Sequence, residues 1–328
     1  MKDPLDRRSF LTIAGASLGV GALFRVLPAS AAGPGPEISR LFRDQNGEAP
    51  GGFSFVQISD THVGFEGPPN PLGTKAFEHA VEVVNALPHQ PDLVLFTGDL
   101  THDTEKPGEH AARMKRFREI ASGLKVKNVK LVPGEHDAGQ DHGVLFKSVF
   151  GDTHYSFDHK GVHFVALDNV SQGRPIVGPE QVAWLKNDLS RFPKTAPIVV
   201  FTHRPLFDLA PEWEWFTNDG DDVMNVLAPF DDVTVLYGHI HRQDQRVLGR
   251  ARHLAARSLI FAFPDPSLGV PKKPIAFDKE KPFANLGVRE VRAESKGASL
   301  AVNDIELTIK EYAGSAGISQ VKKGGLFA

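Results

Sequence analysis

Five short segments of the sequence place carboxylate and imidazole side chains close to one another. They are Asp60-Thr61-His62, Gly98-Asp99, Gly134-Glu135-His136-Asp137, Thr202-His203-Arg204-Pro205 and Gly238-His239-Ile240-His241. A carboxylate and an imidazole two residues apart can both turn toward one metal ion, and several such pairs can hold two divalent ions. Two ions about 3.5–4 Å apart lower the pKa of a bridging water and bind substrate oxygens. The segments therefore favour the chemistry of a metal-dependent hydrolase.

The composition restricts which ligands such a site can use. The 328 residues include 14 His and no Cys, which excludes disulfides, thiolate zinc sites and a cysteine nucleophile. The 37 basic and 40 acidic residues give a formal charge of −3. Because this charge provides no bulk positive field, we expect no stable nucleic-acid partner.

Each of the five segments follows an apolar run of strand length. The runs are Phe53–Ser59, Leu93–Thr97, Val129–Val132, Ile198–Thr202 and Val233–Tyr237. Between them, apolar residues at three-to-four spacing predict helices over Thr74–Leu87, Glu109–Ser122 and Pro179–Arg191. This alternation predicts an α/β fold, in which loops after the strands converge on one rim of a sheet.

Further segments favour a second set of strands. Residues 154–167 predict a β-hairpin, and strands are expected at Ser258–Phe263, Leu286–Val291, Ser299–Val302 and Ile305–Lys310. The Pro- and Lys-rich residues 264–284 are expected to form a loop, because the short β segment beyond them could not fold alone. We predict a single domain over 32–328, with its motif core at 53–241 and a C-terminal β segment at 285–311.

The first 31 residues have the composition of a cleaved signal peptide. Arg7 and Arg8 precede an uncharged run from Leu11 to Phe24, and small residues up to Ala31 suit a signal peptidase. The run is too short for a stable membrane span. The arginine pair followed by Ser-Phe-Leu resembles a twin-arginine (Tat) export signal. We therefore expect a periplasmic or secreted protein with no membrane span in its mature form, and with the Tat machinery as a partner during export.

Taken in order, the five segments resemble the signature of the calcineurin-like metallophosphoesterase superfamily: D-x-H, G-D, G-N-H-[D/E], a lone H, and G-H-x-H. The resemblance covers residues 53–241. It implies a four-layer αββα sandwich of two mixed β-sheets flanked by helices. It also implies a dinuclear phosphoesterase that hydrolyses phosphodiesters or phosphomonoesters by attack of a metal-bridging hydroxide. A small phosphate ester is then the substrate.

The resemblance also assigns roles to individual residues. The first metal ion would be held by Asp60, His62, Asp99 and His241. The second would be held by Asp99, which bridges, together with Glu135, His203 and His239. His136 would contact the scissile phosphate and protonate the leaving oxygen, with Asp137 placed to orient it. The expected cofactors are two divalent ions of Mn, Zn or Fe.

Glu135 departs from the signature, which has Asn at this position. Its carboxylate can still reach the second ion, but it adds a negative charge that weakens attraction for a phosphate dianion. We therefore hypothesise that the site either favours a singly charged phosphodiester or holds one trivalent iron. Two alternatives stay open: a weakly active or inactive periplasmic metal-binding homologue, and a pyrophosphohydrolase of nucleotide or lipid intermediates.

Weaker signals surround these segments. Arg204 can clamp a substrate phosphate oxygen, although packing or a surface ion pair is an equal alternative. His102 and Asp103 are placed to orient metal ligands. Trp213 and Trp215 can stack on a substrate, but a local cluster that covers the sheet is the preferred interpretation.

Overall fold

The computed structural model describes residues 52–106, 108–293 and 300–308. The predicted signal peptide at 1–31 lies outside this part of the chain. Within it, no helix has the length and apolar character needed to cross a membrane.

The first sheet contains five strands in the order β11-β10-β1-β2-β3. Their bounds are β1 (Phe53–Ile58), β2 (Leu93–Thr97), β3 (Val129–Val132), β10 (Gly287–Ala293) and β11 (Ala301–Glu306). Strands β1, β2 and β3 are parallel, with Phe55 opposite Leu93 and Val94 opposite Val129. Strands β10 and β11 complete the sheet as antiparallel neighbours on the other side of β1.

The second sheet contains six strands in the order β4-β5-β6-β7-β9-β8. Their bounds are β4 (Tyr155–His159), β5 (Val162–Ala166), β6 (Pro197–Phe201), β7 (Asp232–Tyr237), β8 (Asp244–Leu248) and β9 (Ala251–Ala255). Strands β5, β6, β7 and β9 are parallel to their neighbours in this group. Strands β4 and β8 pair antiparallel at the two edges.

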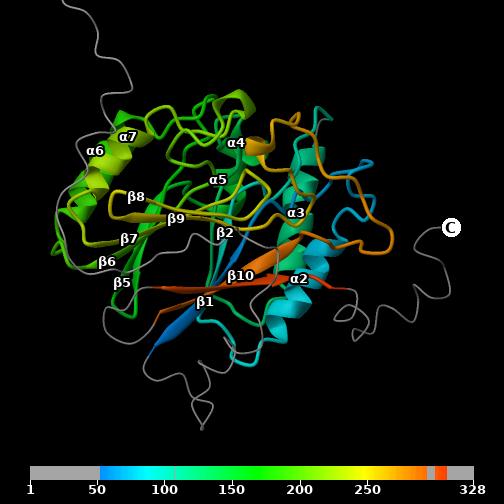
Figure 1. Ribbon diagram of the computed structural model, residues 1–328, viewed down its shortest axis with the longest axis horizontal. Helices are drawn as coiled ribbons and strands as arrows, with labels where there is room; N and C mark the ends of the chain where they lie inside the picture. The colour runs from blue at the N-terminus through cyan, green and yellow to red at the C-terminus, as the bar shows by residue number, and fades with distance from the viewer. Residues whose placement is uncertain (1–51, 107, 294–299, 309–328) are drawn as a thin grey trace, which may run out of the picture. The chain divides into compact units, whose positions relative to one another are not determined.

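Helices cover the outer face of each sheet. Helices α2 (Lys75–Asn85) and α3 (Glu109–Ala121) pack on the first sheet, and α6 (Pro179–Leu189) and α7 (Gly220–Leu227) pack on the second. Figure 1 shows the two pairs on opposite sides of the strands. The short helices α4 (Glu135–Ala138) and α5 (Val144–Phe150) follow β3. The predicted αββα sandwich of two mixed sheets is therefore confirmed.

Alternating side chains hold these layers together. In β1, Phe53 and Phe55 point into the core between the sheets, whereas Val56 and Ile58 point toward the helices. In β5, Phe164 points into the same inter-sheet core, and Val165 packs against the outer helices of the second sheet. Because both faces of these strands are buried, their sequences are mostly apolar, with Ser54, Gln57 and His163 as the polar exceptions.

The strands and helices that lead into the five segments are confirmed within one or two residues at each end. One further strand prediction is wrong, and two others form a single strand. Ser258–Phe263 forms only an isolated bridge from Ser258 to Ser59, since its backbone instead contacts the loop after β1. The predicted strands Ser299–Val302 and Ile305–Lys310 correspond, in the described residues, to the single strand β11. Asp304 at its centre pairs with Arg289 of β10 instead of forming a turn.

The inter-sheet core should dominate stability. Phe164 is fully buried, with its ring centroid 5.6 Å from that of Phe55 and 4.9 Å from that of Phe157. We expect Phe164→Ala to lower the free energy of unfolding by about 3–5 kcal/mol, because it leaves a cavity between the sheets. Urea denaturation of the metal-free protein measures this. Val144→Ala, at a side chain that is 68% exposed, is the control, and a similarly small effect for both variants would contradict the packing.

Candidate metal centre

The five segments meet at one rim because the strands that carry them end there. Backbone hydrogen bonds join their loops directly: the Asp60 amide donates to the Gly98 carbonyl at 3.1 Å, and the His62 amide donates to the Asp99 carbonyl at 2.9 Å. Between the sheets, the His239 amide donates to the Asp60 carboxylate at 3.1 Å. The strand ends of both sheets therefore form one connected surface.

The backbone at this rim is strained. Among the described non-glycine residues, nine have positive φ, and five of them are predicted metal ligands: Asp60, His62, Asp99, His239 and His241. Left-handed φ is costly for residues with a Cβ and tends to persist at functional sites. Gly134 adds a close approach, since a Cβ there would lie 2.0 Å from an Asp99 carboxylate oxygen.

The first ligand group contains Asp60, His62, Asp99 and His241, with ligand atoms within 4.8 Å of one another. The Nε2 atoms of His62 and His241 lie 3.2 Å apart. His62 Nε2 is 3.3 Å from Asp99 Oδ2, and His241 Nε2 is 3.4 Å from Asp60 Oδ1. His241 Nδ1 donates to the Phe261 carbonyl at 3.0 Å, which leaves Nε2 with a lone pair for a cation.

The second ligand group contains Glu135, His203 and His239. His203 Nδ1 donates to the Thr97 carbonyl at 2.7 Å, and His239 Nε2 donates to the Glu214 carbonyl at 3.2 Å. The other ring nitrogens face Glu135: His203 Nε2 is 2.8 Å from Oε2, and His239 Nδ1 is 2.8 Å from Oε1.

Two buried atoms of this second group indicate that it suits a metal ion. Glu135 Oε2 and His203 Nε2 lie 2.8 Å apart, but neither has a well-formed hydrogen bond to the other or to another described residue, and buried polar atoms without hydrogen bonds are costly. A cation between them would satisfy both. The nitrogen and oxygen donors suit Zn, Mn or Fe, so the residues fit a metal ion.

Asp99 connects the two groups. Its Oδ2 atom lies 3.3 Å from His62 Nε2 in the first group and 3.4 Å from His203 Nε2 in the second. The structure thus brings together all seven predicted ligands, with Asp99 where a bridging carboxylate must be.

Comparison with known proteins decides the family. The calcineurin-like phosphoesterase profile matches residues 53–243, more than half of the chain. The chain belongs to the calcineurin-like phosphoesterase family. It is accordingly an enzyme that hydrolyses phosphate esters and depends on metal ions.

Two relatives and one structure illustrate the likeness. This phosphoesterase is 28% identical to a probable glycerophosphodiester phosphodiesterase GpdQ of Arcobacter nitrofigilis, over 62% of this chain and 77% of the relative. It is 29% identical to the 3',5'-cyclic adenosine monophosphate phosphodiesterase CpdA of Escherichia coli K12, over 57% and 69%. A dimetal phosphatase from Danio rerio shares the fold, with a TM-score of 0.53 and 14% identity over 77% of this chain and 98% of that one.

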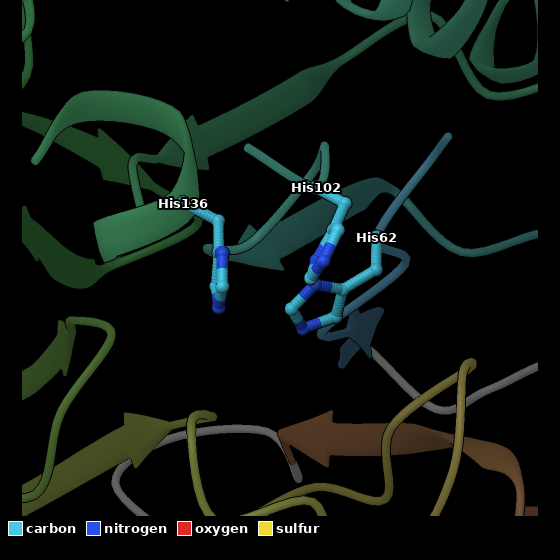
Figure 2. A group of neighbouring side chains, drawn as sticks. All are labelled: His62, His102 and His136. Carbon is cyan, nitrogen blue, oxygen red and sulfur yellow. The ribbon is translucent and has the colours of Figure 1, made fainter. Parts of the chain in front are cut away.

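His136 of the phosphoesterase lies beside the first ligand group. Figure 2 shows His62, His102 and His136 projecting from separate segments toward one another. The ring centroid of His136 is 4.8 Å from that of His62 and 4.7 Å from that of His102. His136 Nδ1 is 2.5 Å from Asp103 Oδ1. Its other ring nitrogen is therefore available for proton donation to a leaving group.

The charges around His136 favour its protonated form. Burial lowers the pKa of His136, but the Asp99 carboxylate, the hydrogen bond to Asp103 and the Glu135 carboxylate outweigh burial and raise the pKa to about 10. Bound cations would oppose this rise. Burial and the charges of His136 and Arg113 outweigh the Asp103 and Asp99 carboxylates and lower the pKa of His102 to about 4.

Asp137 does not orient His136, contrary to the prediction. It accepts hydrogen bonds from the backbone amides of Gly134, Leu100 and Thr101 at 2.8–2.9 Å. His136 and Asp137 are consecutive residues of helix α4, and consecutive helical side chains do not face each other. Asp103 occupies the orienting position, and Asp137 instead ties the loop after β2 to α4.

The remaining sequence signals have defined places. Trp213 and Trp215 are buried in a cluster with Tyr237 and Ile240, which confirms a local cluster instead of a stacking surface. His102 Nδ1 lies 3.2 Å from His62 Nδ1, where it can orient that ring. The carbonyls that hold the other ligand rings, at Thr97, Phe261 and Glu214, were not predicted, since every residue type carries one.

Substitutions of Asp103 and Asp137 should affect different properties, the first catalysis and the second stability. We expect Asp103→Asn to lower kcat about 10–100-fold with unchanged metal content, because Asp103 belongs to neither ligand group. Asp137→Asn should lower the thermal unfolding temperature, because its backbone contacts weaken. Steady-state kinetics, elemental analysis and thermal denaturation measure these effects. A catalytic loss confined to the Asp137 variant, with stability unchanged, would restore the original assignment.

Proposed function

We propose that this phosphoesterase hydrolyses phosphodiesters at a pair of divalent metal ions. Asp60, His62, Asp99 and His241 would hold one ion, and Asp99, Glu135, His203 and His239 the other. Two such ions activate water for attack and polarise the phosphate oxygens. His136, held through Nδ1 by Asp103, donates a proton to the departing alcohol.

The contacts of Arg204 support a preference for a phosphodiester substrate. A phosphomonoester dianion has a second negative charge that needs a cation besides the metal ions. Arg204 Nη1 donates to the Glu214 carbonyl at 2.8 Å, and its Nη2 is 3.4 Å from Glu135 Oε1. Because this guanidinium faces a protein carboxylate, a singly charged diester suits the site better. The phosphodiesterase names of two relatives support the same choice.

A matched pair of aryl esters tests this proposal. We expect kcat/KM for bis(4-nitrophenyl) phosphate to exceed that for 4-nitrophenyl phosphate by about tenfold or more, because one extra charge lacks a partner. The mature protein, residues 32–328, is reconstituted with Mn, Zn or Fe before the assay.

Two variants serve as controls for the assay. Asp99→Asn should lose two-metal occupancy and activity on both esters together. His136→Ala should lose activity while it retains the metal. A monoester preference would contradict the diester proposal, and no turnover with any of the metals would favour a metal-binding homologue. Full turnover by both variants would refute the assigned roles.

We also propose that the protein is exported by the Tat pathway to the periplasm or beyond. The support is the arginine pair at Arg7 and Arg8, followed by the weakly apolar run to Phe24. This pathway carries folded proteins, so metal ions can be inserted before export.

Conservative substitution of the arginine pair tests export. We expect Arg7→Lys with Arg8→Lys to leave the precursor inside a bacterial host that has a functional Tat system, since the pair is what the machinery recognises. Cell fractionation measures the exported share, and N-terminal sequencing should find Ala32 first. Arg25→Lys is the matched control. Unchanged export of the double variant would exclude the Tat assignment.

A further inference from the structure

The second ligand group contains a carboxylate and an arginine in close contact. Arg204 Nη2 lies 3.4 Å from Glu135 Oε1. We propose that Arg204 is the charge partner of Glu135, and that the pair together sets the affinity of the second metal ion. The inference rests on the proposed two-metal centre and assigns its tuning to a residue outside both ligand groups.

Hydrogen bonds hold both the backbone and the guanidinium of Arg204. Its backbone amide donates to Asn169 Oδ1 at 3.2 Å, and its Nη1 donates to the Glu214 carbonyl at 2.8 Å. The side chain is only 12% exposed. A largely buried guanidinium requires an anionic partner, and Glu135 is the acidic side chain that contacts it.

Glu135 contacts both imidazoles of the second ligand group. Its Oε2 atom lies 2.8 Å from His203 Nε2, and its Oε1 atom lies 2.8 Å from His239 Nδ1. The carboxylate therefore acts at once on the ligand group and on Arg204.

The Glu135–Arg204 pair neutralises the extra negative charge that Glu135 brings to the second ligand group. A carboxylate ligand strengthens attraction for a cation, and a guanidinium at this distance weakens it. Together they present to the second ion about the same charge as one neutral amide ligand. The site can then hold two divalent ions, and a trivalent ion is not needed to restore the charge.

Charge-neutralising variants of each partner and of both test the coupling. Glu135→Gln should weaken binding of the second Zn or Mn ion about 10–100-fold, because Arg204 then repels it unopposed. Arg204→Gln should strengthen binding about tenfold. The double variant should return to within about threefold of the wild type, and Arg204→Lys should keep the wild-type affinity because it keeps the charge. Competition against a chromophoric chelator measures the affinity of each ion separately from activity.

Arg250→Gln is the matched control. It makes the same change in net charge, but Arg250 pairs with Asp231 just before the start of β7, whereas the metal ligands follow the end of that strand. Its metal affinity should not change, and circular dichroism should show a native fold for every variant. If the Arg204→Gln variant does not fold, the coupling can still be measured by comparing the metal affinity of the double variant with that of Glu135→Gln.

The outcomes separate this inference from the proposed function. Unchanged or weaker binding in Arg204→Gln, or a double variant that binds no better than Glu135→Gln, would overturn the charge pairing. A wild-type protein that binds only one ion would instead refute the two-metal centre.

Discussion

The crowding of buried charge at one rim is the constraint on which this structure depends. Asp60, Asp99 and His203 are each at most 1% exposed, and carboxylates that are removed from water need compensating cations. The facing imidazoles supply part of this compensation. Their Nε2 atoms nevertheless point at carboxylates and at each other, an arrangement that metal ions satisfy better than protons do.

The rest of the fold maintains this unfavourable cluster. Strained backbone at five ligand positions costs of order 1–3 kcal/mol each and persists only if the surroundings enforce it. Parallel strands buried on both faces fix the start of each ligand loop. Hydrogen bonds such as that from the His62 amide to the Asp99 carbonyl fix its continuation. The inter-sheet core around Phe55 and Phe164 thus stabilises the site as well as the fold.

The limits of sequence-based prediction follow from the same physics. Strand β2 is buried on both faces and its residues up to Phe96 are all apolar, so the run to Thr97 and the site residue Asp99 beyond it could be predicted together. The hairpin of β8 and β9 was not predicted, because β8 lies at a sheet edge, where the polar Arg246 is partly buried and the apolar Val247 is exposed. The role that the family resemblance implied for Asp137 is wrong, because its carboxylate accepts from backbone amides instead of from His136. The true partner of His136 is Asp103, 33 positions away.

The two sides of the centre differ in how their ligands are supported, and the difference suggests a division of labour. Beside the first group, His102 and His136 add ionisable side chains around His62, so the proposed proton donor lies on that side. Beside the second group, the carbonyl of Glu214 accepts from both His239 and Arg204. Glu214 lies between two buried tryptophans and has a φ of 60°, so the aromatic cluster fixes this carbonyl. The aromatic cluster therefore positions both the candidate metal ligand His239 and the guanidinium of Arg204 that faces Glu135.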